Sequence, residues 1–136
     1  MSAIAASAPL ITFPDGLVGQ PDWKQFVLVT PTEDVPVKLL QSIDNKELAL
    51  IVTDPVQLVT DYAVQLSDDD SEVLGLSPDE RPVVLTTISI YGDQITTNLA
   101  GPLVINARTR QGKQVVLVDP AYSTRHPVAT LGEQGS

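Results

Sequence analysis

Short apolar runs rich in Val, Ile, Leu and Thr alternate along the chain with Pro, Gly and Asp. Branched side chains favour the extended backbone of a β-strand, and Pro, Gly and Asp favour the turns that end it. Short runs separated by turn residues are typical of an all-β protein. The pattern predicts strands at Gln25–Val29, Val37–Ile43, Leu48–Thr53, Tyr62–Leu66, Pro82–Tyr91, Ile95–Leu99, Leu103–Ala107 and Lys113–Val118.

Helical signals are few, and both candidate helices are short. Asp54 can cap a helix at Pro55–Val59, because an aspartate accepts hydrogen bonds from the first turn and proline suits the first helical position. Ser67 or Asp68 can cap a second helix within Ser67–Leu76, whose first turn carries acids. Many short strands with one or two short helices predict an all-β barrel or sandwich.

The 136 residues are enough for one domain, and neither a linker nor an internal repeat divides them. The start of the chain is rich in Ala and Ser, and its end is rich in polar residues and Gly. Such termini are often poorly ordered. We therefore expect a flexible segment at residues 1–9, one folded domain at 10–128 and a flexible tail at 129–136.

Seventeen acids and eight bases give a formal net charge of −9, but this charge is concentrated in one interval. No base lies between Lys46 and Arg81, and the other eight acids of the chain are balanced by its eight bases. An acidic surface repels nucleic acid and anionic lipid, so we expect neither as a partner. The interval is either a solvated surface or a face that attracts a basic protein. Its nine acids are Glu47, Asp54, Asp61, Asp68, Asp69, Asp70, Glu72, Asp79 and Glu80.

The residue types that many enzymes and metal sites use are scarce. The chain has no cysteine, and its single histidine, His126, stands near the C-terminus. There is therefore no thiolate for a nucleophile or a metal site, and no Gly-x-Ser-x-Gly motif supports a serine hydrolase. The run Asp68–Asp70 does not begin an EF-hand, because its sixth and twelfth positions hold Val73 and Asp79. We expect no metal and no cofactor.

No apolar run approaches the roughly 20 residues that a membrane-spanning helix needs. The first nine residues also lack the basic region of a secretion signal. The sequence therefore favours a soluble, cytoplasmic protein.

Two other functions stay open at this point. Paired carboxylates such as Asp61 and Asp93 could serve a small β-barrel hydrolase or a carbohydrate-active domain. An aromatic content of 4% is low for a cleft that stacks sugars. Exposed strand edges could instead assemble copies of the chain into an oligomer, whose state the sequence does not give. An apolar barrel interior without a pocket holding two carboxylates would argue against the hydrolase.

Seven segments, in their order and spacing, resemble a known protein family. They are Ile11–Gly19 (ITFPDGLVG), Leu40–Ser42 (LQS), Leu50–Val52 (LIV) with Pro55 after it, Asp61–Tyr62, Thr97–Asn106 (TNLAGPLVIN), Gly112–Leu117 (GKQVVL) and Tyr122–Pro127 (YSTRHP). From about Leu10 to Pro127, the chain resembles FliW, the flagellar assembly factor family. One departure lies at Met1–Pro9, which does not look like the additional strand and turn with which these proteins usually begin.

The resemblance implies a small antiparallel β-barrel-like domain and a role that is not enzymatic. FliW-like proteins bind flagellin in the cytoplasm. When flagellin is exported, they bind CsrA, a small dimeric RNA-binding regulator, which then releases the flagellin message. The resemblance therefore implies CsrA and flagellin as partners, and relief of CsrA repression by exchange of one partner for the other.

In that light, two groups of residues are candidates for partner contact. The turn with Asp44, Asn45 and Glu47 adjoins the base-free interval, which also supplies Asp68, Asp69, Asp70 and Glu72. The second group surrounds the break at Gly101-Pro102 and consists of Asn98, Leu99 and Pro102. This segment either presents a backbone edge to a partner or is tied down by Asn98 and Asn106, because asparagine readily bonds to turn backbone.

Four aromatic residues complete the sequence predictions. Phe13, Trp23 and Phe26 are expected in the core. Tyr62 is expected either in the core with a hydrogen-bonded hydroxyl or at an interface as an anchor.

Overall fold

The computed structural model describes residues 10–30, 37–59 and 61–130. Within these ranges the strands are β1 (Leu10–Thr12), β2 (Gln25–Val29), β3 (Val37–Ser42), β4 (Ala49–Thr53), β5 (Val83–Tyr91), β6 (Gln94–Thr97), β7 (Leu103–Asn106), β8 (Gln111–Gln114) and β9 (His126–Thr130). A 3-10 helix, η1 (Pro55–Gln57), and an α-helix, α2 (Asp68–Leu74), complete the fold. No helix in the described ranges is both long enough and apolar enough to cross a membrane.

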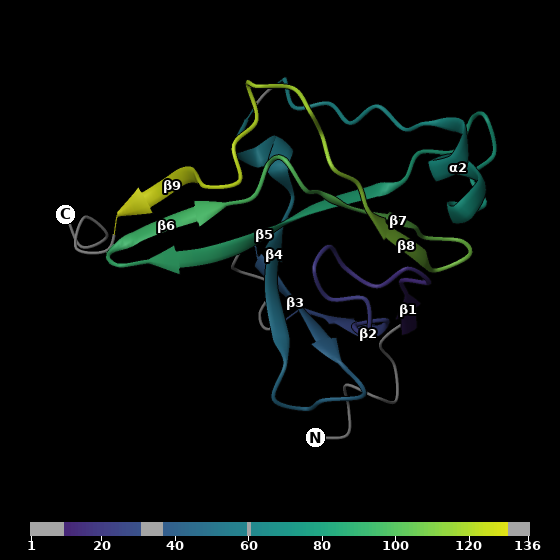
Figure 1. Ribbon diagram of the computed structural model, residues 1–136, viewed down its shortest axis with the longest axis horizontal. Coiled ribbons are helices and arrows are strands. Elements are labelled where there is room, and N and C mark those ends of the chain that lie inside the picture. The colour runs from purple at the N-terminus through teal and green to yellow at the C-terminus, as the bar shows by residue number, and fades with distance from the viewer. Residues whose placement is uncertain (1–9, 31–36, 60, 131–136) are drawn as a thin grey trace.

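Seven of the strands close into a barrel in the order β4-β3-β2-β1-β8-β7-β5, with β5 pairing again with β4 (Figure 1). Every pair around the barrel is antiparallel except β1–β8, which meet in parallel at Thr12 and Gln111. This confirms the expected all-β, barrel-like domain.

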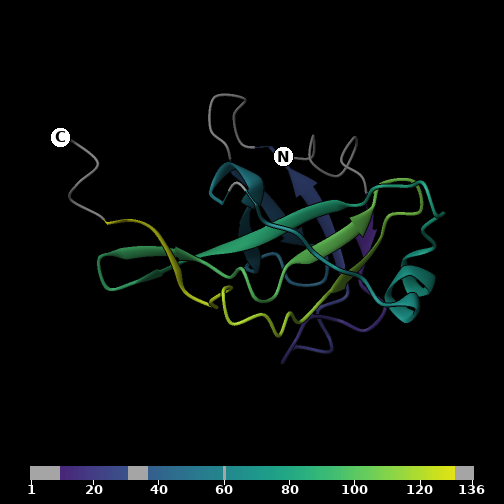
Figure 2. The same ribbon diagram turned by 90° about the horizontal axis from the view of Figure 1, so that it is seen from above.

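The long strand β5 belongs both to the barrel and to an arm that leaves it. Residues Val83–Leu85 pair with β7, and Ile51–Thr53 of β4 pair with the next part of β5. Its last residues, Ile88–Tyr91, pair with β6, and β6 pairs with β9. The arm formed by β5, β6 and β9 and the helix α2 lie at opposite ends of the molecule (Figure 1, Figure 2).

Apolar side chains fill the barrel. Phe13 and Phe26 are completely buried, and their rings meet edge to face with centroids 5.8 Å apart. The core placement of Phe13 and Phe26 is confirmed, whereas Trp23 is half-buried and packs against this cluster from its margin. The other buried members are Ile11, Leu17, Leu40, Val52, Leu85, Leu103 and Ile105.

A second apolar cluster lies outside the barrel. Leu103 and Ile105 of β7 belong to the interior cluster, whereas Val104 between them belongs to the outer one, because successive residues of a strand face opposite sides. Val104 is covered by Leu74 of α2 and Val115, with Val64, Leu66, Leu76 and Leu117 packed around them. Residues 62–66 and α2 therefore form an outer layer on one face of the barrel wall.

Most predicted elements are present with small shifts at their ends, but two predicted strands differ in the structure and two observed strands were not predicted. Tyr62–Leu66 does not form a strand: it lies extended over the barrel wall without pairing in a sheet. The predicted strand Lys113–Val118 is displaced, because β8 starts two residues earlier and ends at Gln114. The two strands that were not predicted are β1, which has only three residues, and β9, which contains Pro127. Proline is tolerated in β9 because this is an edge strand.

The expected end of the domain, at residue 128, falls inside strand β9. Strand β9 pairs Ala129 with Ile95 and Thr130 with Gln94, so it runs two residues beyond the expected boundary at 128. Residues 1–9 and 131–136 lie outside the described ranges, as does the departure expected at Met1–Pro9.

Candidate protein-binding site

Helix α2, in the second half of the base-free interval, is held firmly at both ends. At its start, the Ser67 hydroxyl accepts a hydrogen bond from the Asp70 N–H (3.0 Å), and the Asp70 carboxylate accepts one from the Ser67 N–H (3.3 Å). This reciprocal capping box confirms Ser67 as the cap. At its end, Gly75 adopts the left-handed conformation (φ 67°) that glycine tolerates best. Leu74 anchors the helix in the outer cluster.

The acids of α2 differ in what they contact. Asp70 forms an ion pair with Lys113 of β8 (2.7 Å), and this hydrogen bond lowers the pKa of Asp70 and raises the pKa of Lys113. Asp68, Asp69 and Glu72 are exposed, and within the described residues none of them forms an ion pair. Asp70 therefore fixes the helix to the barrel, and the other three form what we call the α2 acidic face.

The fold also brings a second base to the interval that lacks bases in sequence. Arg108, in the loop after β7, donates to both carboxylate oxygens of Glu80 (2.9 and 3.1 Å) and to the Gly75 carbonyl (2.8 Å). The hydrogen bonds from Arg108 lower the pKa of Glu80 to about 2. Asp54 caps η1 by accepting from the Val56 N–H (3.1 Å). The acidic charge is therefore less segregated in space than in sequence.

The turn between β3 and β4 is exposed, as expected, and its backbone is tightly held. The Ser42 hydroxyl accepts from the N–H groups of Asp44 (3.1 Å) and Asn45 (3.0 Å). Asn45 in turn accepts from the Glu47 N–H (3.1 Å), and the Gln41 amide donates to the carbonyl of Leu48 (3.0 Å). The backbone that carries the Asp44 and Glu47 carboxylates is thus fixed by hydrogen bonds.

The turn and the α2 acidic face do not form one continuous patch. Figure 1 shows the turn between β3 and β4 at the lower edge of the barrel and α2 at the right of the molecule. The acidic candidates therefore belong to two separate surfaces.

The segment around Gly101-Pro102 lies inside the molecule. Leu99 is 1% exposed, and its N–H donates to the Ser123 carbonyl (2.9 Å). Pro102 is buried, and its carbonyl accepts from the Val115 N–H (3.0 Å). Asn98 accepts from the Ala100 N–H (3.1 Å), so it ties this segment down. These contacts support the alternative in which the segment is tied down by Asn98. The side chains of Leu99 and Pro102 are buried and therefore not accessible to a partner.

The sequence suggested that Asn106 ties down the break at Gly101-Pro102. In the structure its side chain bonds instead to backbone groups at the end of α2 and in the loop after β7. Its amide donates to the carbonyls of Leu74 (2.8 Å) and Gly75 (3.2 Å) at the end of α2. Its side-chain oxygen accepts from the N–H groups of Arg108 (2.9 Å) and Thr109 (3.4 Å). The sequence did hold a signal, because an asparagine ending the apolar run LVIN needs buried hydrogen-bond partners, but it could not show which.

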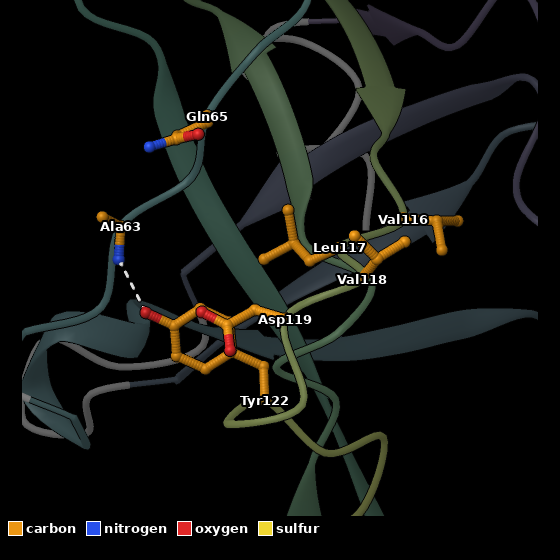
Figure 3. Close-up of a pocket in the computed structure, with 7 residues that line it drawn as sticks. All are labelled: Ala63, Gln65, Val116, Leu117, Val118, Asp119 and Tyr122. Atoms are coloured by element: carbon orange, nitrogen blue, oxygen red, sulfur yellow. Dashed lines mark hydrogen bonds between the residues drawn. The ribbon is translucent and has the colours of Figure 1, made fainter.

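Tyr62 is buried with a bonded hydroxyl, which is the first of the two roles expected for it. Its hydroxyl donates to the Leu99 carbonyl (2.6 Å), and burial raises its pKa above the usual value. Its ring lies 4.7 Å from that of Tyr122, whose hydroxyl accepts from the Ala63 N–H (3.3 Å; Figure 3). The two tyrosines thus fasten the extended residues 62–66 to the barrel.

The geometry gives the hydrolase alternative no support in the described residues. A cleft of about 330 Å³ holds one carboxylate, Asp119, and clefts of about 260 and 120 Å³ hold none. Asp61 and Asp93 are both exposed and line none of these three clefts. Within the same residues, no group of three His, Cys, Asp or Glu side chains could hold a metal ion.

Comparisons with known proteins agree on one family. The family model described as FliW protein matches residues 3–128. The chain is 40% identical to a flagellar assembly factor FliW of Geobacter sulfurreducens over 88% of this chain and 76% of the relative. It is 35% identical to another, from Natranaerobius thermophilus, over 93% and 85%. A crystal structure of a flagellar assembly factor FliW superposes with a TM-score of 0.80 at 32% identity, covering 88% of this chain and 85% of that one.

Proposed function

Because this chain belongs to the FliW family of flagellar assembly factors, we propose that it binds CsrA and flagellin in turn. In this proposal, the chain holds flagellin in the cytoplasm until flagellin is exported. The freed chain then binds CsrA and relieves repression of flagellin translation. It acts by binding proteins, without a catalytic step and without contacting RNA or a membrane itself.

The α2 acidic face is the observation that carries the CsrA part of this proposal. A regulator that binds RNA must present a basic surface to the phosphates. Asp68, Asp69 and Glu72 are exposed on a helix fixed by its capping box and by the Asp70–Lys113 ion pair. Such preorganised acids can attract a basic protein and, once bound, repel RNA phosphates near it. Screening limits this repulsion to about 8 Å at physiological salt, so the face must lie close to the path of the RNA.

The second contact in the proposal is the turn with Asp44, Asn45 and Glu47. Its backbone is held by Ser42 and Gln41, so binding costs little conformational freedom there. Since the turn and α2 are on separate surfaces, it either reaches a second protomer of the dimeric CsrA or contacts flagellin. Binding measured separately to each protein would distinguish these two cases.

The experiment that tests the α2 acidic face neutralises Asp68 and Glu72, which are four residues apart and so share one side of the helix. The variant D68N/E72Q is compared with D22N/D93N, which removes the same charge from exposed positions outside the interval. We expect D68N/E72Q to associate with CsrA several-fold more slowly at low salt, with a flatter salt dependence and weaker displacement of RNA. The control should associate nearly as fast as wild type.

Two results would overturn the proposal at different levels. Equal rates and salt dependences for both variants would reduce the acidic face to a solvated surface. If neither CsrA nor flagellin comigrated with the wild-type chain on a sizing column at micromolar concentration, the exchange of partners itself would be wrong.

A further inference from the structure

A cleft apart from the α2 acidic face lies beside the extended residues 62–66. It has a volume of about 330 Å³ and is bounded by Ala63 and Gln65 on one side and residues 116–119 on the other, with Tyr122 at its end (Figure 3). Two of its lining residues are apolar and exposed: Val116 is 63% and Val118 is 94% exposed. Single exposed apolar residues are common on protein surfaces, but two that line the same cleft offer a partner an apolar contact beside a hollow.

The backbone of residues 115–118 is paired along one edge only. The Val115 N–H donates to the Pro102 carbonyl (3.0 Å), and the Leu117 N–H donates to the Ala100 carbonyl (2.7 Å). Bonds from alternate residues indicate an extended segment, in which the N–H groups of Val116 and Val118 point the opposite way. Neither of these two N–H groups is bonded to any residue that the structure describes. The segment thus presents a free strand edge, which is a template for pairing with another chain.

The charge around the cleft selects the kind of chain that could pair there. The only charged side chain among its described lining residues is Asp119. One oxygen of this carboxylate accepts from the Ala121 N–H (2.9 Å), which fixes its orientation and leaves the other oxygen available. A basic residue is therefore favoured at this end of the cleft. A second copy of the chain is disfavoured, because each copy carries a net charge of −9.

We propose that this cleft binds an extended segment of a partner protein, which adds as a strand along residues 116–118. The segment presents alternating apolar side chains to the exposed valines and a lysine or arginine to Asp119. Main-chain hydrogen bonds supply affinity in this mode, and side chains at alternate positions supply specificity. The inference goes beyond the proposed function, because it holds whichever protein supplies the segment.

The test begins with a displayed library of random nine-residue peptides, selected on the immobilised wild-type chain. We expect enriched sequences with apolar residues at alternate positions and a basic residue at one end. One enriched peptide is then synthesised with a fluorophore, and its affinity is measured by fluorescence anisotropy. A library with no enrichment over a blank surface would overturn the proposal.

Matched variants then separate backbone pairing from simple apolar contact. V118P removes one free N–H and keeps an apolar side chain of three carbons, whereas V118A removes two exposed methyl groups and keeps the N–H. We expect V118P to weaken peptide binding at least tenfold and V118A less than threefold. V116K should also weaken binding tenfold, whereas V56K, at a valine 52% exposed on η1, should have no effect.

Folding, self-association and the α2 acidic face are each controlled for separately. Equal affinities of V118P, confirmed folded by its melting curve, and wild type would overturn strand addition. A wild-type dimer that V118P abolishes would assign the edge to a second copy and overturn the proposed partner. D68N/E72Q should bind the peptide like wild type, so failure of the α2 acidic face and failure of the cleft can be told apart.

Discussion

The barrel and its outer layer both contain extended backbone, yet they are held by different forces. Inside the barrel, Phe13, Phe26 and their neighbours form a large apolar cluster. The outer layer rests on a smaller cluster around Leu74 and Val104 and depends on side-chain hydrogen bonds from Asn106 and Tyr62. Burial of apolar area stabilises the barrel irrespective of direction, whereas hydrogen bonds fix the layer in one orientation.

This difference bears on function, because both the α2 acidic face and the cleft lie in or beside the outer layer. The α2 acidic face belongs to the layer, and the cleft lies between residues 62–66 and residues 116–119, which follow β8. A layer held by a few polar contacts can be loosened while the barrel stays folded. Perturbing each region separately should therefore give distinct results.

The largest expected effect comes from changing Gly112 in β8 to alanine. A Cβ atom there would lie 2.6 Å from the ring of Phe13, which is completely buried. Overpacking a rigid core costs up to about 3 kcal/mol, so we expect a loss of this size in the free energy of unfolding by urea.

Two comparisons test the cause of that loss. G101A places a Cβ 2.9 Å from the amide nitrogens of Asn98 and Gln114. These are the ends of flexible side chains and not a buried ring, so a small shift of their hydrogen bonds can relieve the contact and the loss should be smaller. In the double variant G112A/F13L, the smaller side chain should recover part of the loss. If the two single losses simply added, Phe13 would not be the cause.

A smaller and more local effect is expected from N106A. Asn106 is 1% exposed and joins the end of α2 to the loop after β7 through the amide nitrogen and the oxygen of its side chain. Leaving these buried groups unpaired costs about 2 kcal/mol. Hydrogen exchange should become faster in residues 67–76 while β2 and β3 keep their protection.

The exposed Asn45 provides the matched control for this prediction. N45A removes one hydrogen bond at an exposed turn, so it should cost less than about 1 kcal/mol. Equal acceleration of exchange in the barrel and in α2 of N106A would show that the two regions unfold as one unit.

The barrel was more accessible to sequence reasoning than the outer layer, and the reason is physical. Alternating branched residues and the turn at Asp44–Lys46 report local geometry, so β2, β3, β4 and their hairpin were predicted closely. The strand at Tyr62–Leu66 was predicted from the same alternation, which shows an extended chain but not whether it pairs. Whether Val64 meets a neighbouring strand or the face of a sheet depends on residues far away in sequence.

The candidate site shows the same limit. The capped helix and its acids follow from local sequence, but the partners of Asp70 and Glu80 lie 43 and 28 residues away, at Lys113 and Arg108. Leu99 and Pro102 were candidates because the segment around the Gly101-Pro102 break could present a backbone edge to a partner. Tyr62 and Val115 bury this segment instead, and no local pattern predicts that.

The smallest expected effect concerns the surface ion pair that links Glu80 to Arg108 behind α2. Two hydrogen bonds from Arg108 lower the pKa of Glu80 from 4.5 to about 2 in the folded chain. A carboxylate with a lowered folded pKa stabilises the fold above its unfolded pKa, and this contribution disappears as the pH falls from about 4.5 to 2.

The variant E80Q should therefore match wild type more closely in melting temperature at pH 2 than at pH 6. Because the pair is exposed to solvent, the difference at pH 6 should be smaller than the effect of N106A and should shrink further in 1 M salt. Should E80Q instead lower the melting temperature as much as N106A does at pH 6, this exposed pair would hold the outer layer as strongly as the buried amide of Asn106. The layer would then depend on exposed charge beyond the Asp70–Lys113 ion pair that fixes α2 to the barrel.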